Sequence, residues 1–320
     1  MKIFAVWIAL VSVLFAKMES ITIFPKDYNQ TATSKVTFLD VKDLSFGHIG
    51  WQQFYGISAL AYDKDTDVLY MLSDRSRLFK FKLVIRDNKI ITLKPLWAHR
   101  LRDKKGRKFF IKRSDSEGMT LVQKEGQKVL LISFEQQPKV MAFDLEGREI
   151  TGRYATLTRL PKILQKVKSY RAENTMLESI TYTKKFGVIV TPEYPLAKKA
   201  LADPHSLYNQ KGEICKIRKT NPYGAITELE TMPDGNLLAL QREFDPATFD
   251  IIISLQKIYL NHQKRGFCQT EDLINMTNKQ GWELDNFEGL TYLGNGLYLM
   301  ISDDNSNIFQ KTLLVLFHLS

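Results

Sequence analysis

The sequence predicts an all-β protein folded as a single β-propeller of five blades, or six if one blade is irregular. An apolar hairpin pattern recurs five times along the 320 residues, each copy ends in an acidic residue, and no linker separates the copies. The first apolar residues of the hairpins lie 59, 61, 49 and 61 residues apart, at Leu60, Met119, Ile180, Leu229 and Leu290. An all-β unit of this period is typical of propeller blades, because one blade cannot bury its faces without neighbours.

The first 16 residues are expected to be a signal peptide. Lys2 precedes an apolar run from Ile3 to Phe15, and Ala16 supplies a small residue for cleavage. This run is too short for the roughly 20 residues that span a bilayer. An uncleaved anchor is the alternative, because Leu14-Phe15-Ala16 departs from the small-x-small pattern. We expect a periplasmic or secreted protein, with residues 17–320 as the propeller and no stable membrane span after cleavage.

Each hairpin alternates apolar and polar residues with the period of a strand, and its turn carries residues such as Asp234-Gly235. At least one more strand is predicted after each hairpin. These further strands cover residues 78–85 and 90–96 in the first unit, then 140–144, 213–218, 251–260 and 312–319 in the later units. Three or four antiparallel strands per unit fit a blade.

Two regions outside the hairpins have their own predictions. The segment SKVTFLDV, within residues 21–44, is expected to add an outer strand after Leu319 and so join the two ends of the chain. Short helices are expected around Leu160, Ile163, Leu164 and Val167, and at Thr270-Glu271-Asp272. The stretch from Pro192 to Pro204 is expected to be a loop.

Composition limits the classes of function. The two cysteines, Cys215 and Cys268, either pair or remain free, and the sequence does not decide between these. The formal net charge of +10 comes from scattered Lys and Arg residues, which favour anionic partners or are simply solvated. Nucleic acid is not an expected partner, because no recognition motif is present. The sequence also contains no P-loop, dinucleotide fingerprint or HExxH motif.

The acidic residues of the repeats are expected to converge. In an antiparallel hairpin, the start of the first strand and the end of the second lie at the same end. At the strand starts, the aligned positions hold Ser58, Glu117, Glu178, Thr227 and Glu288; Glu228 is left out of this alignment. At the strand ends stand Asp74, Glu135, Glu193, Glu243 and the pair Asp303-Asp304. The sequence therefore predicts a ring of carboxylates on one propeller face.

Crowded carboxylates repel each other, so they are expected to bind a metal, pair with cations or take up protons. Many oxygen ligands without clustered His or Cys favour Ca²⁺. Arg75 and Arg242 are expected to bind an anionic substrate beside this metal. The alternative is that the acidic residues are solvated, or bond backbone groups and fasten neighbouring blades together.

Several segments resemble a known family. They are GISALAYDKDTDVLYMLSDR, SEGMTLV with SFE, NTMLESIT, MPDGNLLALQRE and LDNFEGLTYLGNGLYLMISDDNSNIFQKTLLVLF. They are similar to the bacterial phytase-like family described as having esterase-like activity of phytase, over about residues 50–320. The DNFEGLT and SDDN…QKTLL segments are the most specific.

The resemblance implies an exported propeller related to phosphoester hydrolases. The positions that match by motif are Asp74-Arg75, Glu117, Glu135, Glu178, Glu193, Arg242-Glu243, Glu288 and Asp303-Asp304-Asn305. The chain lacks the acidic DAxDDPA-like run of calcium-dependent propeller phytases, so the resemblance does not extend to phytate as substrate. The leading hypothesis is metal-assisted hydrolysis of a small anionic phosphate or carboxylic ester, with Asn305 among the substrate-binding residues. A non-catalytic binding or scaffold propeller of the cell envelope is the alternative.

Overall fold

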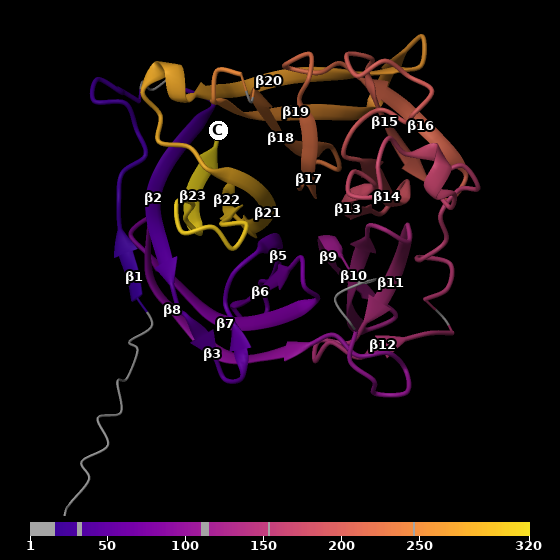
Figure 1. Ribbon diagram of the computed structural model, residues 1–320, viewed down its shortest axis with the longest axis horizontal. Coiled ribbons are helices and arrows are strands. Elements are labelled where there is room, and N and C mark those ends of the chain that lie inside the picture. The colour runs from indigo at the N-terminus through magenta and orange to yellow at the C-terminus, as the bar shows by residue number, and fades with distance from the viewer. Residues whose placement is uncertain (1–16, 31–33, 110–114, 153, 246) are drawn as a thin grey trace, which may run out of the picture.

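The computed structural model describes residues 17–30, 34–109, 115–152, 154–245 and 247–320. The expected signal peptide lies outside these residues. Five blades surround a common axis in the described part of the chain (Figure 1). In the same residues, no helix is long and apolar enough to cross a membrane.

The first two blades are four-stranded antiparallel sheets. Blade one consists of β5 (Ile57–Asp63), β6 (Val68–Ser73), β7 (Arg77–Arg86) and β8 (Lys89–Arg100). Blade two consists of β9 (Ser116–Lys124), β10 (Gln127–Phe134), β11 (Lys139–Phe143) and β12 (Glu149–Ile150).

Blades three and four also have four antiparallel strands each. Blade three consists of β13 (Leu177–Thr183), β14 (Gly187–Pro192), β15 (His205–Asn209) and β16 (Gly212–Ile217). Blade four consists of β17 (Ala225–Thr231), β18 (Leu237–Asp245), β19 (Asp250–Lys264) and β20 (Phe267–Thr277). A single parallel pairing of Lys216 in β16 with Phe267 in β20 joins their outer edges.

Blade five contains strands from both ends of the chain, in the order β21 (Asn286–Gly294), β22 (Leu297–Asp303), β23 (Leu313–Leu319), β2 (Val36–Ser45) and β1 (Lys17–Ser20). β2 pairs antiparallel with β23, so the expected closure by the N-terminal strand is confirmed. Hydrogen bonds between the two end segments therefore hold the first and last parts of the propeller together. A short hairpin of β3 (His48–Ile49) and β4 (Gln52–Gln53) precedes blade one.

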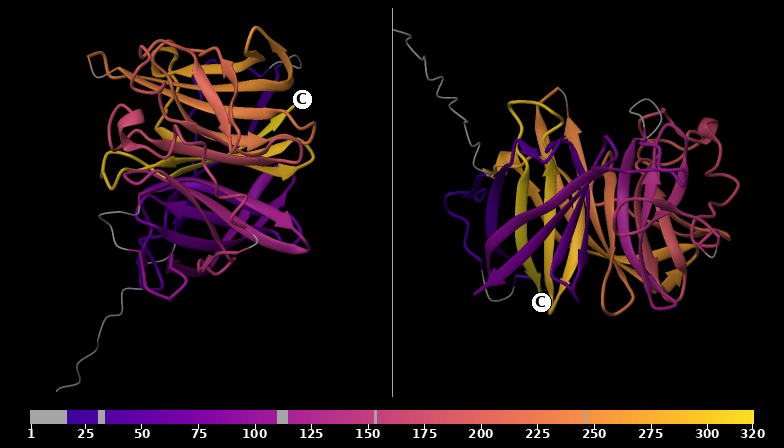
Figure 2. Two further views of the ribbon diagram at one scale, coloured as in Figure 1. Left: turned by 90° about the vertical axis from the view of Figure 1, so that its right-hand side faces the viewer. Right: turned by 90° about the horizontal axis from the view of Figure 1, so that it is seen from below.

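The innermost strands of the blades form a ring. β5 contacts β9, β9 contacts β13, β13 contacts β17, β17 contacts β21, and β21 returns to β5. In the side views, the blades lie next to one another, and many of their strands run roughly along the axis that the blades surround (Figure 2). This cyclic order confirms the propeller fold and gives five blades in the described residues.

In the described residues, the hydrophobic core is divided into five clusters, and each fills the space between two neighbouring blades. The cluster between blades one and two, for example, packs Tyr70 and Leu72 against Leu130 and Ile132. The other four clusters join blades two and three, three and four, four and five, and five and one. Every blade therefore buries an apolar face on each side, which requires both neighbours.

Two helix predictions were wrong. Thr270-Glu271-Asp272 lies within strand β20, where Thr270 and Glu271 pair with Ile258 and Lys257. Around Leu160 to Val167 the chain forms turns, followed by one 3₁₀ turn, η2 (Val167–Ser169). Another 3₁₀ turn of the described residues is η3 (Asn278–Gln280). In the first region the apolar spacing has another cause, because Leu160 and Leu164 anchor a loop in the core between blades two and three.

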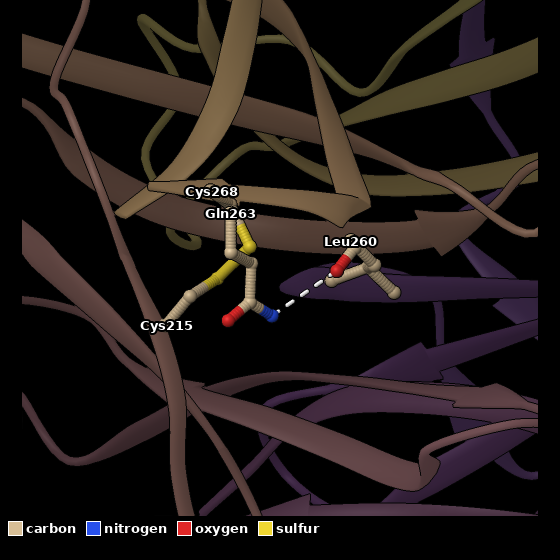
Figure 3. The surroundings of a disulfide bond; sticks show 4 residues. All are labelled: Cys215, Leu260, Gln263 and Cys268. Atoms are coloured by element: carbon tan, nitrogen blue, oxygen red, sulfur yellow. Dashed lines mark hydrogen bonds between the residues drawn. A yellow bond between two sulfur atoms is a disulfide. The ribbon is translucent and has the colours of Figure 1, made fainter. Parts of the chain in front are cut away.

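Cys215 and Cys268 form a disulfide, which the sequence left open. It joins β16 of blade three to β20 of blade four, across 53 residues of sequence (Figure 3). Gln263, drawn beside it, donates a hydrogen bond of 3.1 Å to the Leu260 carbonyl. The disulfide reinforces an edge where the two blades share one backbone pairing.

Candidate metal centre

The carboxylates predicted at the strand starts share one local structure, a β-bulge in the innermost strand of each blade. The pairing skips Ser58 in β5, Glu178 in β13, Thr227 in β17 and Glu288 in β21. In β9 the irregularity contains Glu117 and Gly118. A bulge inserts a residue into the strand and redirects its side chain. The five aligned positions therefore correspond in the structure.

In blade four, the residue at the end of the second strand is not the predicted Glu243. Asp303 pairs with Asn286, two residues before the bulge residue Glu288. In blade four, Arg242 pairs with Ala225, two residues before Thr227. Arg242 therefore occupies the position that the sequence alignment gave to Glu243. The Glu243 carboxylate instead accepts a hydrogen bond of 3.0 Å from the Tyr223 backbone N–H.

Two overlapping carboxylate triads lie in the centre. Asp115, Glu117 and Glu135 place one oxygen each within 4.8 Å of one another, and so do Glu135, Glu178 and Glu193. Glu135 belongs to both triads and is only 4% exposed. Two oxygens bound to the same Ca²⁺ at about 2.4 Å are at most about 4.8 Å apart, so both triads have spacings that fit one calcium ion.

Burial and mutual repulsion raise the pKa values of these carboxyls. Burial is the main cause at Glu135, whose pKa rises to about 8, and at Glu193, whose pKa rises to about 7. The pKa values of Glu117 and Glu178 lie well above the usual range, first because of burial and then because of neighbouring carboxylates. A bound cation would remove this penalty, because it stabilises the charged forms.

The innermost strands and their ends carry further buried acidic groups. Burial, followed by the Glu288 charge, raises the pKa of Asp303 to about 9. Asp74 has a pKa raised to about 6 by burial, and its Oδ1 has no hydrogen-bond partner among the described residues. Glu228 is 1% exposed, and its Oε2 is likewise unpartnered there. Buried oxygens without donors favour a cation nearby.

Arg242, which was predicted to bind substrate, is held between two carboxylates of the centre. Its Nη1 lies 3.1 Å from Glu288 Oε1, and its Nη2 lies 3.3 Å from Glu193 Oε1. Glu288 Oε1 also accepts a hydrogen bond of 2.7 Å from Asn286 Nδ2. Arg242 thus links blades three and five from its position in blade four.

Some of the predicted carboxylates fasten blades together. Glu135 Oε1 accepts a hydrogen bond of 2.6 Å from the Met176 N–H, which joins blade two to the chain entering blade three. Asp304 Oδ1 accepts one of 3.0 Å from the Gly56 N–H, which joins blades five and one. Asp303 Oδ1 bonds the nearby Asn305 N–H at 2.7 Å. Asp304 therefore has a structural role, and Glu135 has one in addition to its place in the triads.

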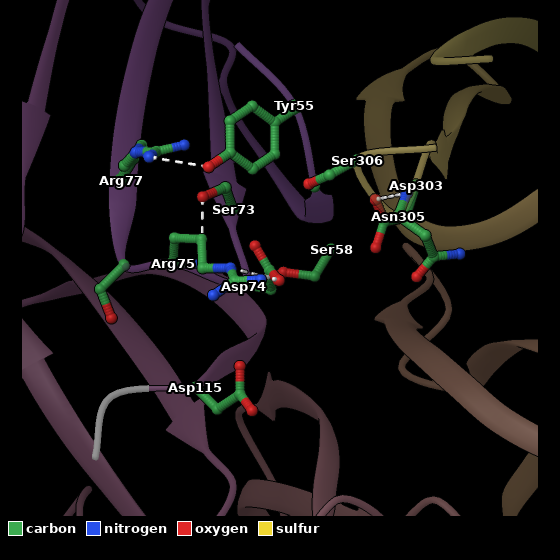
Figure 4. Close-up of polar contacts among 12 residues, drawn as sticks. Tyr55, Ser58, Ser73, Asp74, Arg75, Arg77, Asp115, Asp303, Asn305 and Ser306 are labelled. Atoms are coloured by element: carbon green, nitrogen blue, oxygen red, sulfur yellow. Dashed lines mark hydrogen bonds and ion pairs between the residues drawn. The ribbon is translucent and has the colours of Figure 1, made fainter. Parts of the chain in front are cut away.

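A group of arginines lies on the blade-one side of this centre (Figure 4). Arg75 Nε is 3.2 Å from Asp74 Oδ2, and its charge also acts on Asp115. Arg77 is 6% exposed, donates a hydrogen bond of 3.0 Å to the Tyr55 hydroxyl, and has an Nε without a partner in the described chain. Arg100 Nη1 donates to the Arg75 carbonyl at 3.3 Å, and burial and then the Arg77 charge lower the Arg100 pKa.

Sequence reasoning missed four residues of this region: Asp115, Glu228, Arg77 and Arg100. Asp115 directly precedes the aligned SEGMT segment, and allowing two acidic positions per strand start would have found it. Glu228 follows the bulge residue of blade four, so an alignment with one position per strand excluded it. Arg77 and Arg100 lie on β7 and β8 and carry no motif.

Comparison with known proteins identifies one family that covers most of the chain. The family model for phytase-like proteins, described as esterase-like activity of phytase, matches residues 52–306. The sequence matches no curated protein.

Three of the solved structures that are similar to this chain show how distant the similarity is. The RRP9 WD40 repeats are 7% identical, with a TM-score of 0.47, and cover 95% of this chain and 100% of their own. The PQQ-bound aldose sugar dehydrogenase from Streptomyces coelicolor is 10% identical, with a TM-score of 0.44 and coverages of 90% and 99%. The Cps50 (Swd1) β-propeller domain from Myceliophteria thermophila is 10% identical, with a TM-score of 0.39 and coverages of 95% and 100%. These similarities are too low to bear on ligands or activity.

Proposed function

The chain belongs to the phytase-like family, and from this premise we propose that it is an exported hydrolase that cleaves a small anionic ester with the help of Ca²⁺. The observation that carries the proposal is the pair of carboxylate triads that share the buried Glu135. Their oxygen-only donor set suits a hard cation. Their position among the bulges of the inner strands gives them a rigid support.

In this proposal Asp115, Glu117 and Glu135 hold the cation, with Glu178 and Glu193 completing the site. When bound there, Ca²⁺ would polarise the ester and lower the pKa of a water molecule. Beside a bound cation the Glu193 carboxyl would be ionised, and as a carboxylate it would accept a proton from that water. Arg242 orients the Glu193 carboxylate, because its Nη2 lies 3.3 Å from Glu193 Oε1.

The arginine group favours a phosphate ester over a carboxylic ester. Arg75, Arg77 and Arg100 have Asp74 as the only carboxylate paired with them among the described residues. Guanidinium groups bind phosphate oxygens in bidentate fashion, and a neutral ester offers them no charge. Arg75 is the member that faces Asp115 of the first triad, so it is the residue expected to orient the phosphate.

Two features support export. The first 16 residues have the pattern of a signal peptide. The Cys215–Cys268 disulfide is of the kind that persists in oxidising compartments such as a periplasm.

Purified protein assayed against aryl phosphates, aryl carboxylic esters and phytate, with Ca²⁺ or with EGTA, tests the proposal. Hydrolysis of an aryl phosphate that EGTA abolishes and Ca²⁺ restores is the expected result. Arg75→Gln should lower kcat/KM for this substrate at least tenfold, because the anion loses its orienting charge. Inactivity across the panel in the presence of Ca²⁺ would overturn the proposal.

A non-catalytic scaffold is the second candidate, and a specific observation favours it. The Glu135 and Asp304 carboxylates and the Arg242 guanidinium all connect neighbouring blades. If this were the whole role of the acidic centre, the protein would bind no Ca²⁺, and EGTA would leave its melting temperature unchanged.

A further inference from the structure

A cavity of about 750 Å³ lies on blade three, outside the carboxylate centre. Three parts of the chain line it: residues 162–169, the loop that begins at Pro192, and the adjoining strands β15 and β16. This volume is within the range of small-molecule binding sites in proteins.

The rim of the cavity is strongly cationic. Its lining includes one acidic residue, Glu213, and five lysines: Lys162, Lys166, Lys168, Lys198 and Lys199. All five lysine side chains are exposed. None of them has an ion-pair partner within the described residues, so their charges are available to a ligand.

The wall between these lysines is apolar. Ile163, Pro195 and Leu196 line the cavity together with the rings of Tyr194 and Tyr208. Ile163 is 50% exposed, which is a cost for an isoleucine unless something covers it. Lysine stems add further apolar surface below their ammonium groups.

Hydrogen bonds hold the cavity in shape without a ligand. The Ala197 N–H donates to the Ser169 carbonyl at 2.9 Å, which ties the two lysine-bearing segments together. Arg171 Nε donates to the Pro195 carbonyl at 2.9 Å, and its Nη2 donates to the Lys199 carbonyl. The Tyr170 hydroxyl donates to the Leu164 carbonyl at 2.7 Å. A preformed site loses less entropy on binding.

We propose that this cavity binds an amphipathic organic anion, in which a carboxylate or phosphate headgroup lies among the lysines and an alkyl body covers Ile163 and Leu196. The ammonium groups recognise the charge of the headgroup, and the apolar wall recognises the body. The acidic centre is adjacent but separate. Glu193 belongs to a triad, and its neighbours Pro192 and Tyr194 form part of the cavity wall. The Tyr194 side chain also hydrogen-bonds Glu193, so the test below uses calcium-free protein to examine this cavity alone.

Calorimetric titration of the full protein in EGTA tests this site. The probes are octyl phosphate and octanoate, which differ in headgroup. The controls are octanol, which has the alkyl chain without the charge, and inorganic phosphate, which has the charge without the chain. Both octyl anions should bind at least tenfold more tightly than either control. Hexyl phosphate should bind about tenfold more weakly than octyl phosphate, because two methylenes are lost. Equal affinity for octanol, equal affinity for inorganic phosphate, or no binding of either octyl anion would overturn the proposal.

Two variants with the same change in net charge distinguish an effect of the cavity lysines on binding from an effect of the overall charge of the protein. Lys198→Glu/Lys199→Glu should weaken octyl phosphate binding at least tenfold. Lys104→Glu/Lys105→Glu, a pair of exposed lysines outside the cavity, makes the same change in net charge and should leave binding unchanged. Equal effects of the two variants would assign the attraction to net charge and contradict a built site. Because these titrations contain EGTA, they give their answer whether or not the protein proves to be a calcium-dependent hydrolase.

Discussion

Glu135 is the residue on which both carboxylate triads depend. Glu135→Gln should lower the affinity for Ca²⁺ at least tenfold, because the site loses a charge that both triads share. The fold should survive, since the glutamine oxygen can still accept the hydrogen bond from the Met176 N–H. Calorimetric titration with Ca²⁺ provides the measurement. Glu243→Gln is the matched control, because this carboxylate bonds the Tyr223 N–H instead; equal losses in both variants would remove Glu135 from the proposed site.

Glu288 has a different role, although it occupies the same bulge position as Glu117 and Glu178. Its oxygen is bonded to Arg242 and Asn286. Glu288→Gln should therefore lower the free energy of unfolding by about 1 to 3 kcal/mol, because Arg242 loses one of its two buried charge partners. The Ca²⁺ affinity should change less than in Glu135→Gln. Urea unfolding of the calcium-free variant checks this, and a gain in stability would show that repulsion among the carboxylates outweighs the ion pair.

At the scale of the strand, the bulges of blades two and five each contain a Glu-Gly pair, Glu117-Gly118 and Glu288-Gly289. At both glycines a neighbouring blade approaches closely. A Cβ added at Gly118 would lie 2.7 Å from the Glu178 carbonyl oxygen and 2.9 Å from the Ile180 nitrogen in blade three. At Gly289 an added Cβ would lie 2.7 Å from Ile301 Cγ2 and 3.2 Å from the Ala59 backbone in blade one. Each glycine thus lets two innermost strands approach beside a carboxylate.

Gly118→Ala should separate blades two and three and destabilise the protein by about 1 to 3 kcal/mol. Because the strain falls beside Glu117 and Glu178, the affinity for Ca²⁺ should fall as well. Thermal melts with and without Ca²⁺ measure both effects. Gly126→Ala is a control for the loss of a glycine, since no atom lies within 4 Å of a Cβ built there, although its positive φ adds some local strain. A variant at Gly118 as stable as the wild type would show that the blades can adjust.

The strands themselves were largely predictable from the sequence, and their register was not. Alternating apolar residues and turn signals identified the inner hairpin of every blade, because the period of two is a local property. The position of Arg242 depends on a bulge in β17, which moves the pairing by one residue and carries no sequence mark in that blade. Thr270 was wrongly predicted to begin a helix, because local capping residues cannot reveal that β19 supplies a pairing partner.

At the scale of the whole molecule, the five-fold repeat predicted both the propeller and the convergence of acidic residues on its axis. The repeat could not show which carboxylates meet, since that depends on spacing between blades rather than along the chain. It brought Glu117, Glu135, Glu178 and Glu193 together correctly, but missed Asp115 and the arginines Arg77 and Arg100. The pairing of Cys215 with Cys268 was also beyond the sequence, because it requires the edges of two blades to meet.

The raised pKa values predict an unusual pH dependence for the calcium-free protein. Glu135 and Asp303 have folded-state pKa values of about 8 and about 9, against ordinary values of 4.5 and 3.8. A carboxyl with a raised pKa stabilises the fold fully below its unfolded pKa, and this contribution is lost as pH rises through the folded pKa. The melting temperature in EGTA should therefore fall between pH 5 and pH 9. A melting temperature that rises over this range would contradict the burial of these groups as uncompensated acids.

The central claim, that the buried carboxylates form a calcium site, is tested most directly by titrating Ca²⁺ into EGTA-treated, dialysed protein at pH 7.5. We predict saturable binding that raises the melting temperature and releases protons, because the ion replaces protons held by carboxyls with raised pKa values. Mg²⁺ should bind more weakly, since it demands a stricter octahedral arrangement. The claim would be contradicted if millimolar Ca²⁺ produced no heat, no proton release and no change in melting temperature. The carboxylates of the acidic centre would then serve only to connect neighbouring blades.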